Sequence, residues 1–154
     1  MINGVKHLPI EGLSQDKFDS YGRILTPSDG ERPEVSEPEV FDFFLLFKMI
    51  SSGWQIGYLT IQTKQVDSLE RHPNTPEVFV PLRGKAAIIA SNDPNEDTSL
   101  HAFHLREPVV LRAGVWHNVV HIAGEVSILI IEGVNVIDDY FALNYSIQCD
   151  ESTR

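Results

Sequence analysis

The sequence has a single cysteine, few basic residues and no long uninterrupted apolar run. One thiol, Cys149, cannot form an internal disulfide, so a reducing compartment fits best. The apolar stretch 41–50 contains Lys48 and is much shorter than a membrane-spanning helix. The first residues also lack the apolar segment of a secretory signal. We therefore expect a cytoplasmic protein that has no membrane partner.

Basic side chains are scarce relative to acidic ones. The chain has 12 Lys and Arg against 22 Asp and Glu, which gives a formal net charge of −10. Nucleic acids and anionic membranes require clustered Lys and Arg, so neither is expected as a partner. A small anionic substrate remains compatible with this charge, provided that its site contains a local positive group.

The length of 154 residues fits one domain, which we expect to span residues 1–154. Residues 12–25 predict a short helix, with Ser14 as its N-cap and Gly22 as a left-handed C-terminal stop. Residues 26–40 are rich in proline and carboxylates and predict a surface loop or an extended arm.

From Phe41 onward, short stretches rich in Val, Ile, Phe and Leu alternate with Gly, Pro, Asn and Asp. This pattern is typical of an all-β barrel or sandwich and not of alternating strands and helices. The last stretch, from Phe141, fits either a strand or a short helix. The predicted architecture is an all-β domain with a short N-terminal helix.

One segment concentrates chemically active side chains. Glu70, His72 and Glu77 lie within eight residues, and Gly84 follows seven residues after Glu77. This spacing resembles the first motif of the cupins, small barrels of the jelly-roll type, in which a histidine usually stands at the position of Glu70. We expect Gly84 to adopt a positive φ in a tight turn.

A second segment resembles the second cupin motif. Gly114 and His117 fit that motif, whereas Arg112 and His121 stand where it usually has proline and asparagine. Gly114, like Gly84, is expected in a turn with positive φ. The two motifs occur in the order found in cupins, with strands predicted between them.

Side-chain alternation predicts that these residues meet. Residues two apart on a strand share a face, so Glu70 and His72 can point into one cavity, as can His117 and His121. In a small closed barrel such residues converge. Two imidazoles and one or two carboxylates suit a divalent transition metal such as Ni, Zn, Mn or Fe. The predicted ligands are His72, Glu77 and His117, with Glu70 as a possible fourth.

Simpler explanations exist for the same residues. Glu70 and Arg71 can form a surface ion pair of little energetic value. A histidine such as His7, His101 or His104 in a β-rich chain is usually structural or exposed. The pocket can also function without metal, as a hydrogen-bonding site.

Three stretches resemble the ureidoglycolate lyase branch of the cupins. These are "LERHPNTPEVFVPLRG" from Leu69, "GVWH" from Gly114 and "LPIEGLSQDKFDSYGRIL" from Leu8. The resemblance implies cleavage of ureidoglycolate to glyoxylate and urea, a step of allantoin degradation in purine metabolism. It also implies a homodimer, for which the segment 26–40 and the aromatic run "FDFFLLF" can supply buried surface.

The chain departs from that family's pattern at several positions. Asn118 and Val119 follow His117 where the family has His-Pro, and Glu132 and Gly133 lie where it has Asp-Arg-Gly-Gly. The family's arginine in the strand before the first signature has no counterpart here. At the position of Glu77 the family can carry glutamine.

The implied reaction needs a base for the substrate hydroxyl, an acid for the leaving nitrogen and a cation for the carboxylate. His72 or Glu77 is the expected base and His117 the expected acid. Arg71 and Arg112 are the expected carboxylate partners, and Glu70 and His121 complete the predicted substrate pocket. Two alternatives are another metal-dependent cupin enzyme, such as an isomerase or oxygenase, and a non-catalytic small-molecule-binding cupin.

Overall fold

We describe residues 1–152 of a computed structural model of the chain. The fold contains eleven strands, one α-helix and one 3-10 turn within this range. In chain order the elements are β1 (Val5–Glu11), α1 (Gln15–Phe18), β2 (Gly22–Ile24), β3 (Val35–Glu37), β4 (Phe41–Phe43), β5 (Trp54–Ile61), β6 (Gln65–Arg71), β7 (Glu77–Ser91), η1 (Asp97–Ser99), β8 (His101–His104), β9 (Val109–Leu111), β10 (Trp116–Gly133) and β11 (Asp139–Asp150).

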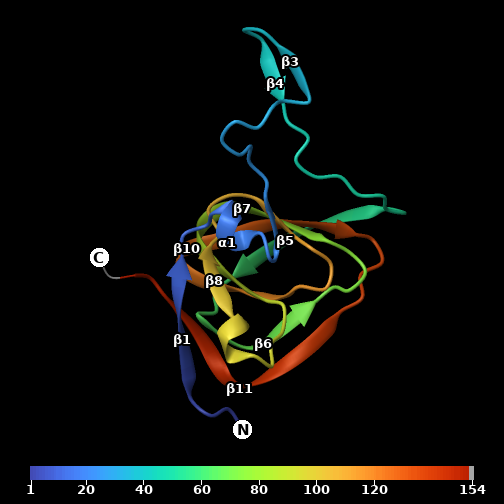
Figure 1. Cartoon of the computed structure of the whole chain (residues 1–154). Coiled ribbons are helices and arrows are strands. Elements are labelled where there is room, and N and C mark those ends of the chain that lie inside the picture. Colours follow the sequence, from blue (N-terminus) through green and yellow to red (C-terminus); the bar gives the residue numbers. More distant parts are fainter. Residues whose placement is uncertain (153–154) are drawn as a thin grey trace.

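Nine strands form one mixed sheet that closes on itself (Figure 1). Its order is β2-β9-β7-β8-β1-β11-β6-β10-β5, and an additional pairing of β7 with β10 closes the ring. β1 pairs in parallel with β11 and β8, and the other pairs are antiparallel. The predicted all-β cupin-type barrel is therefore confirmed. The segment from Phe141 belongs to a strand, which decides between the two alternatives left by the sequence.

The predicted N-terminal helix is confirmed but is shorter than its sequence pattern indicates. It spans only Gln15–Phe18, and the Ser14 side chain makes no capping hydrogen bond. Gly22 does not form a left-handed cap but begins β2, which pairs with β9. A Cβ atom at Gly22 would lie 1.8 Å from the carbonyl oxygen of Val110, so glycine is required there for close backbone approach.

Gly84 and Gly114 both have the predicted positive φ, at 70° and 85°. Gly84 does not form a turn between two strands, however, because it lies inside β7, a single strand of 15 residues. The facing part of β10 shifts its register between His121 and Ile128, so both strands bend together at this point.

Residues 33–48, here called the arm, project from the barrel (Figure 1). β3 and β4 pair within the arm as a small hairpin. The chain then passes 44–53 without forming a strand and enters β5. Of the apolar stretch 41–50, only β4 is a strand, and most side chains of the aromatic run that begins at Phe41 are exposed.

Two groups of buried apolar residues stabilise the barrel. The first includes Phe18, Phe79, Val119 and Ile128, and the second includes Leu69 and other residues of β1, β6, β8 and β11. Alternate residues of the second half of β7 enter different groups, which is why this stretch is apolar on both faces. Within the described residues, no helix is long and apolar enough to cross a membrane.

Candidate active site

The two sequence motifs meet where β6 runs beside β10. His117 on β10 is paired with Glu70 on β6. The amide nitrogen of Gly114 donates to the carbonyl oxygen of His72 at 2.9 Å, which ties the turn before β10 to the end of β6. These backbone contacts place the side chains of both motifs on one side of the sheet.

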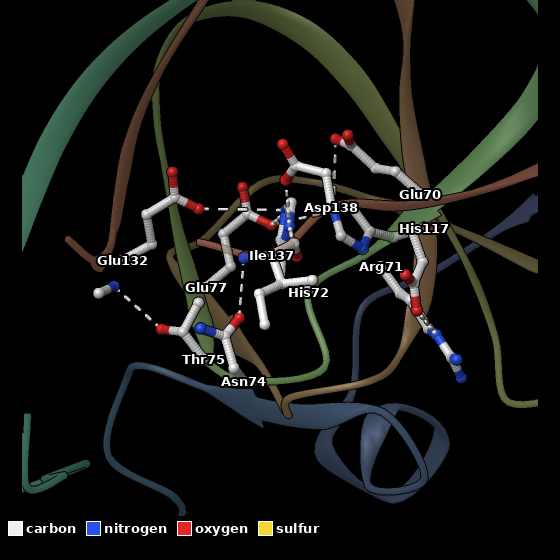
Figure 2. A network of polar contacts seen from close by, with 12 residues as sticks. Glu70, Arg71, His72, Asn74, Thr75, Glu77, His117, Glu132, Ile137 and Asp138 are labelled. Atoms are coloured by element: carbon white, nitrogen blue, oxygen red, sulfur yellow. Dashed lines mark hydrogen bonds and ion pairs between the residues drawn. The ribbon is translucent and has the colours of Figure 1, made fainter. Parts of the chain in front are cut away.

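At the centre of the site, two imidazoles contact the same carboxylate oxygen (Figure 2). The Oε2 atom of Glu77 lies 3.0 Å from Nε2 of His72 and 2.9 Å from Nε2 of His117. All three residues are buried. The expectation that these three motif residues lie together is therefore correct. Their roles as metal ligands or catalytic groups stay predictions.

The other ring nitrogen of each histidine faces an acceptor. Nδ1 of His117 lies 3.0 Å from the carbonyl oxygen of Val115. Nδ1 of His72 lies 2.9 Å from Oδ1 of Asp138 and 3.4 Å from the carbonyl oxygen of Ile137. An Nδ1 proton satisfies these acceptors, so the neutral form of each ring turns the lone pair of Nε2 toward Glu77.

Burial and charge act against each other in this cluster. Burial would raise the pKa of Glu77, but the adjacent histidines His117 and His72 lower it to about 2. Burial would lower the pKa of His72, but the carboxylates of Glu77, Glu70 and Glu132 raise it to about 9. Burial raises the pKa of Glu70, and the two histidines oppose that rise. Without a cation, the site holds its charges as a cluster of close ion pairs.

Two further carboxylates belong to the cluster and were not predicted as site residues. Oε2 of Glu132 lies 4.0 Å from Nε2 of His72, and Asp138 contacts the other nitrogen of that ring. Glu132 could have been recognised, because it is a charged residue within the apolar run of β10. Asp138 lies in the loop between β10 and β11, where strand alternation gives no signal.

Hydrogen bonds to the loop between β6 and β7 hold His72 close to Glu132 and Asp138. Oγ1 of Thr75 accepts a hydrogen bond from the amide of Gly133 at 2.9 Å, and Oδ1 of Asn74 accepts one from the amide of Ile137 at 2.9 Å. The loop that follows His72 is thereby fixed to the loop that carries Asp138.

The donor set suits a divalent cation. Nε2 of His117 and Oε2 of Glu77 are buried and make no aligned hydrogen bond, although they lie 2.9 Å apart. Oε2 of Glu132 is likewise buried without a partner. Ligand atoms of Glu70, His72 and His117, and those of His72, Glu77 and Glu132, lie within 4.8 Å of one another. Two imidazole nitrogens with carboxylate oxygens form a donor set used for transition metals.

A cavity of about 350 Å³ adjoins the cluster. Glu70, Glu77 and His117 reach its wall, together with Phe79 and residues of β5. This volume is at the lower end of the range for small-molecule sites. In the part of the chain that the structure describes, no lysine or arginine lines this cavity.

Comparison with known proteins identifies the family of this chain. The sequence pattern of the ureidoglycolate lyases matches residues 5–145. The chain belongs to the ureidoglycolate lyase family. It is 22% identical over 158 residues to ureidoglycolate lyase 2 of Rhizobium meliloti (strain 1021), covering 92% of this chain and 97% of the relative. It is 29% identical over 123 residues to a ureidoglycolate lyase of Salmonella typhimurium (strain LT2), covering 72% and 77%.

Solved structures of similar shape include cupins. A cupin 2 domain-containing protein from Halorhodospira halophila aligns with a TM-score of 0.43 at 15% identity, covering 58% of this chain and 57% of that one. The sugar 3,4-ketoisomerase QdtA from Thermoanaerobacterium thermosaccharolyticum aligns with a TM-score of 0.45 at 16% identity, covering 79% and 83%.

Three residues predicted to bind substrate lie away from the cluster. Arg71 points to the opposite side of β6 from Glu70 and His72 (Figure 2), where its Nε lies 2.9 Å from Oδ2 of Asp139 and its guanidinium stacks on Trp116. The alternation of strand residues requires this direction. The neighbours of Arg71 occupy the site and Arg71 does not.

Arg112 and His121 are also directed elsewhere. Arg112 donates to the carbonyl oxygen of Asp19, next to the N-terminal helix. His121 shares a face with His117, but four residues of strand separate them by roughly 13 Å. Its Nε2 lies 2.6 Å from the carbonyl oxygen of Gly124, at the bend of β10. Neither residue is positioned to bind a ligand at Glu77.

Proposed function

We propose that this chain cleaves ureidoglycolate, or a closely related small ureido hydroxy acid, to glyoxylate and urea. The observation that carries the proposal is the meeting of two imidazole Nε2 atoms at one buried carboxylate oxygen beside a small cavity, in a chain of the ureidoglycolate lyase family. The cavity volume suits a substrate of this size.

The reaction moves one proton from oxygen to nitrogen. The substrate hydroxyl loses its proton, the oxygen forms the carbonyl of glyoxylate, and the C–N bond breaks with its electron pair remaining on nitrogen. That nitrogen takes up a proton and leaves as urea. The reaction therefore needs a base for the hydroxyl and an acid for the nitrogen. It consumes no oxidant and no water.

Charge decides how the substrate is held. The cluster contains Glu70, Glu77, Glu132 and Asp138 against two histidines, and no lysine or arginine of the described chain lines the cavity. An anionic substrate would be repelled by this arrangement. A divalent cation held by His72, Glu77 and His117 would supply the positive charge that the substrate carboxylate and the developing carbonyl oxygen require.

Glu70 is then the group best placed to move the proton. It lines the cavity, its side chain is partly exposed, and its Oε1 lies 3.7 Å from Nε2 of His117. His72, Glu77 and His117 are occupied as ligands in this arrangement, whereas Glu70 keeps an oxygen free for the substrate hydroxyl. Asp138 holds Nδ1 of His72 and so keeps Nε2 directed to the centre.

A second candidate function has its own support. No arginine among residues 1–152 lines the cavity wall, and Glu77 stands at a position where the family can carry glutamine. Both features fit another metal-dependent cupin reaction. Such an enzyme would hold the same cation with the same three residues but would not release urea from ureidoglycolate.

The test combines metal analysis with product analysis. We expect the purified protein to contain a divalent metal and to release urea and glyoxylate in equal amounts from ureidoglycolate. His72→Ala should reduce turnover at least about 100-fold, as loss of a group in the reacting cluster does. Glu125→Gln, an exposed change on β10, is the matched control. Full metal occupancy without urea release would favour the second candidate.

A further inference from the structure

A hollow on the barrel surface concentrates basic side chains. It has a volume of about 530 Å³ and lies where β7 runs beside the end of β8. Arg83, Lys85, His104 and Arg106 are among the residues that line it, and we call it the basic hollow. Three of the 12 Lys and Arg residues of an acidic chain therefore surround one cavity.

The charged side chains of the basic hollow have no partner among residues 1–152. Arg83, Lys85 and Arg106 make no ion pair and no side-chain hydrogen bond within this range. The acid that follows Arg106 in the sequence, Glu107, accepts instead a hydrogen bond from Oγ1 of Thr26 at 2.8 Å. Five other basic residues do contact a carboxylate: Lys6, Lys17, Arg23, Arg71 and Arg112.

Strand pairing brings two of the unpaired charges together. The amide of Leu105, just past β8, donates to the carbonyl oxygen of Ala86 on β7 at 3.0 Å. Continuing this antiparallel pairing by one residue places Lys85 beside Arg106. Like charges at facing positions destabilise a strand pair. An anion bound between them would remove this cost.

The positive potential of the basic hollow reaches His104. The pKa of His104 is lowered, first by burial and then by the charges of Arg106 and Lys85, while Glu151 opposes the shift. The imidazole is therefore neutral at pH 7 and can still donate one hydrogen bond to an anion.

Gly84 opens the main chain to the same hollow. It lines the hollow and is exposed. Its φ is 70°, and a Cβ atom there would lie 2.7 Å from the carbonyl oxygen of Glu125 on β10. The packing of β10 therefore requires glycine at this position. The same lack of a side chain between Arg83 and Lys85 lets a ligand approach the backbone closely.

We propose that the basic hollow binds a small ligand that carries at least two negative charges, of the class of phosphoryl-bearing compounds. A guanidinium binds phosphate oxygens bidentately, and an ammonium adds a compact point charge. The three cationic side chains supply more charge than a single carboxylate neutralises. The volume of the hollow falls within the roughly 300–1,000 Å³ of small-molecule sites. The site is independent of the proposed lyase reaction, because other residues line the cavity beside Glu77.

Charge favours a small ligand over an extended polyanion. The chain has a net charge of −10, which repels nucleic acid everywhere outside the hollow. Glu107 and Glu125 are exposed and lie next to the hollow, the first beside Arg106 and the second against Gly84. These acids at its border restrict binding to a ligand that fits inside.

The test is a titration with inorganic pyrophosphate, followed through the amide signals of isotope-labelled protein in NMR spectra at constant ionic strength. The amides of residues 83–86 and 104–106 should shift in a saturable way. Acetate, which has one charge, should bind at least about 10-fold more weakly. Pyrophosphate captured by a metal at His72, Glu77 and His117 would shift the amides of that cluster instead, so the two sites are distinguished by residue. Shifts at the cluster alone would overturn the proposal.

Matched variants identify the side chains that bind. Arg106→Gln and Lys85→Gln should each raise the dissociation constant of pyrophosphate at least about 10-fold, because each removes a charge-assisted hydrogen bond. Lys48→Gln, at an exposed position of the arm, should leave the dissociation constant unchanged. An unchanged dissociation constant in Arg106→Gln overturns the proposal, as do equal shifts with sodium chloride. Tighter binding of polyglutamate than of pyrophosphate also overturns it, because the hollow would then belong to a surface for acidic polymers.

Discussion

His117 and Glu77 lie 2.9 Å apart through Nε2 and Oε2, yet neither of these buried atoms has an aligned hydrogen bond. Nδ1 of His117 already faces the carbonyl oxygen of Val115, so the neutral ring directs a lone pair at a carboxylate oxygen. Two acceptors at this distance require a proton or a cation between them. A metal ion and an imidazolium are the two ways in which the site can satisfy this requirement.

Glu77→Gln distinguishes these two states. The change removes an anionic donor but nearly preserves side-chain volume, so folding should survive. If His72, Glu77 and His117 hold a metal, its content per chain should fall sharply, measured by elemental analysis after gel filtration. Glu125→Gln should keep wild-type metal content. Unchanged metal in Glu77→Gln would remove Glu77 from the ligand set and would favour a site in which His72 and His117 transfer protons.

Asp138 should act through His72 and not as a ligand. Asp138→Ala removes the carboxylate 2.9 Å from Nδ1 of His72, and we expect metal affinity to fall roughly 10–100-fold, as for other residues that orient a ligand. Asp138→Asn should recover part of this loss because its amide oxygen can accept the same proton. Competition with a coloured chelator measures both affinities. Equal affinities for Asp138→Ala and wild type would exclude the orienting role.

The metal-free protein should show a pH optimum of stability. The pKa of His72 is raised from 6.5 to about 9, so its contribution to the free energy of unfolding is complete below pH 6.5 and is lost as the pH rises toward 9. The pKa of Glu77 is lowered from 4.5 to about 2, so its contribution is complete above pH 4.5 and is lost as the pH falls toward 2.

Thermal melting of the chelator-treated protein across this range measures both effects. Stability from the cluster should be greatest between about pH 4.5 and 6.5. In Glu77→Gln the decline toward pH 9 should be weaker, because the carboxylate nearest to His72 is gone. An alkaline decline of the same size in wild type and Glu77→Gln would show that this ion pair does not cause it.

Gly22→Ala should destabilise the barrel. The new Cβ would lie 1.8 Å from the Val110 carbonyl oxygen, so β2 and β9 would have to separate, at a cost of at least about 1–3 kcal/mol. Gly12→Ala is the matched control, because no atom beyond Gly12 and its two chain neighbours lies within 4 Å of its Cβ position, and a change within about 0.5 kcal/mol is expected. Urea unfolding measures both. Equal stabilities would mean that the two strands adjust without cost.

Spacing within strands explains what the sequence could predict about the site. His72, Glu77 and His117 occupy motif positions, and Glu70 shares a strand face with His72, so these four could be placed together. The same alternation argues against Arg71, which stands between Glu70 and His72. A substrate carboxylate would favour a guanidinium at the site, but strand alternation directs Arg71 to the opposite face.

Other features depend on contacts that no local pattern records. Asp138 reaches His72 from a loop, and Gly22 is required by the backbone of β9, far away in the sequence. The aromatic run that begins at Phe41 has the composition of a buried strand, yet most of its side chains are exposed. Composition identifies side chains that need an apolar neighbour but does not identify where that neighbour is.

Between Ile128 and Glu132, the side chains of β10 alternate between the two faces of the sheet. Ile130 and Glu132 face the first buried group and the histidines, whereas Leu129 and Ile131 lie on the opposite face of the sheet and are partly exposed. A mutation that inserts or deletes a single codon between Ile128 and Glu132 would exchange the two sets, because a shift of one residue reverses every following side chain. Insertions and deletions in this stretch should therefore be far less tolerated in the gene than substitutions.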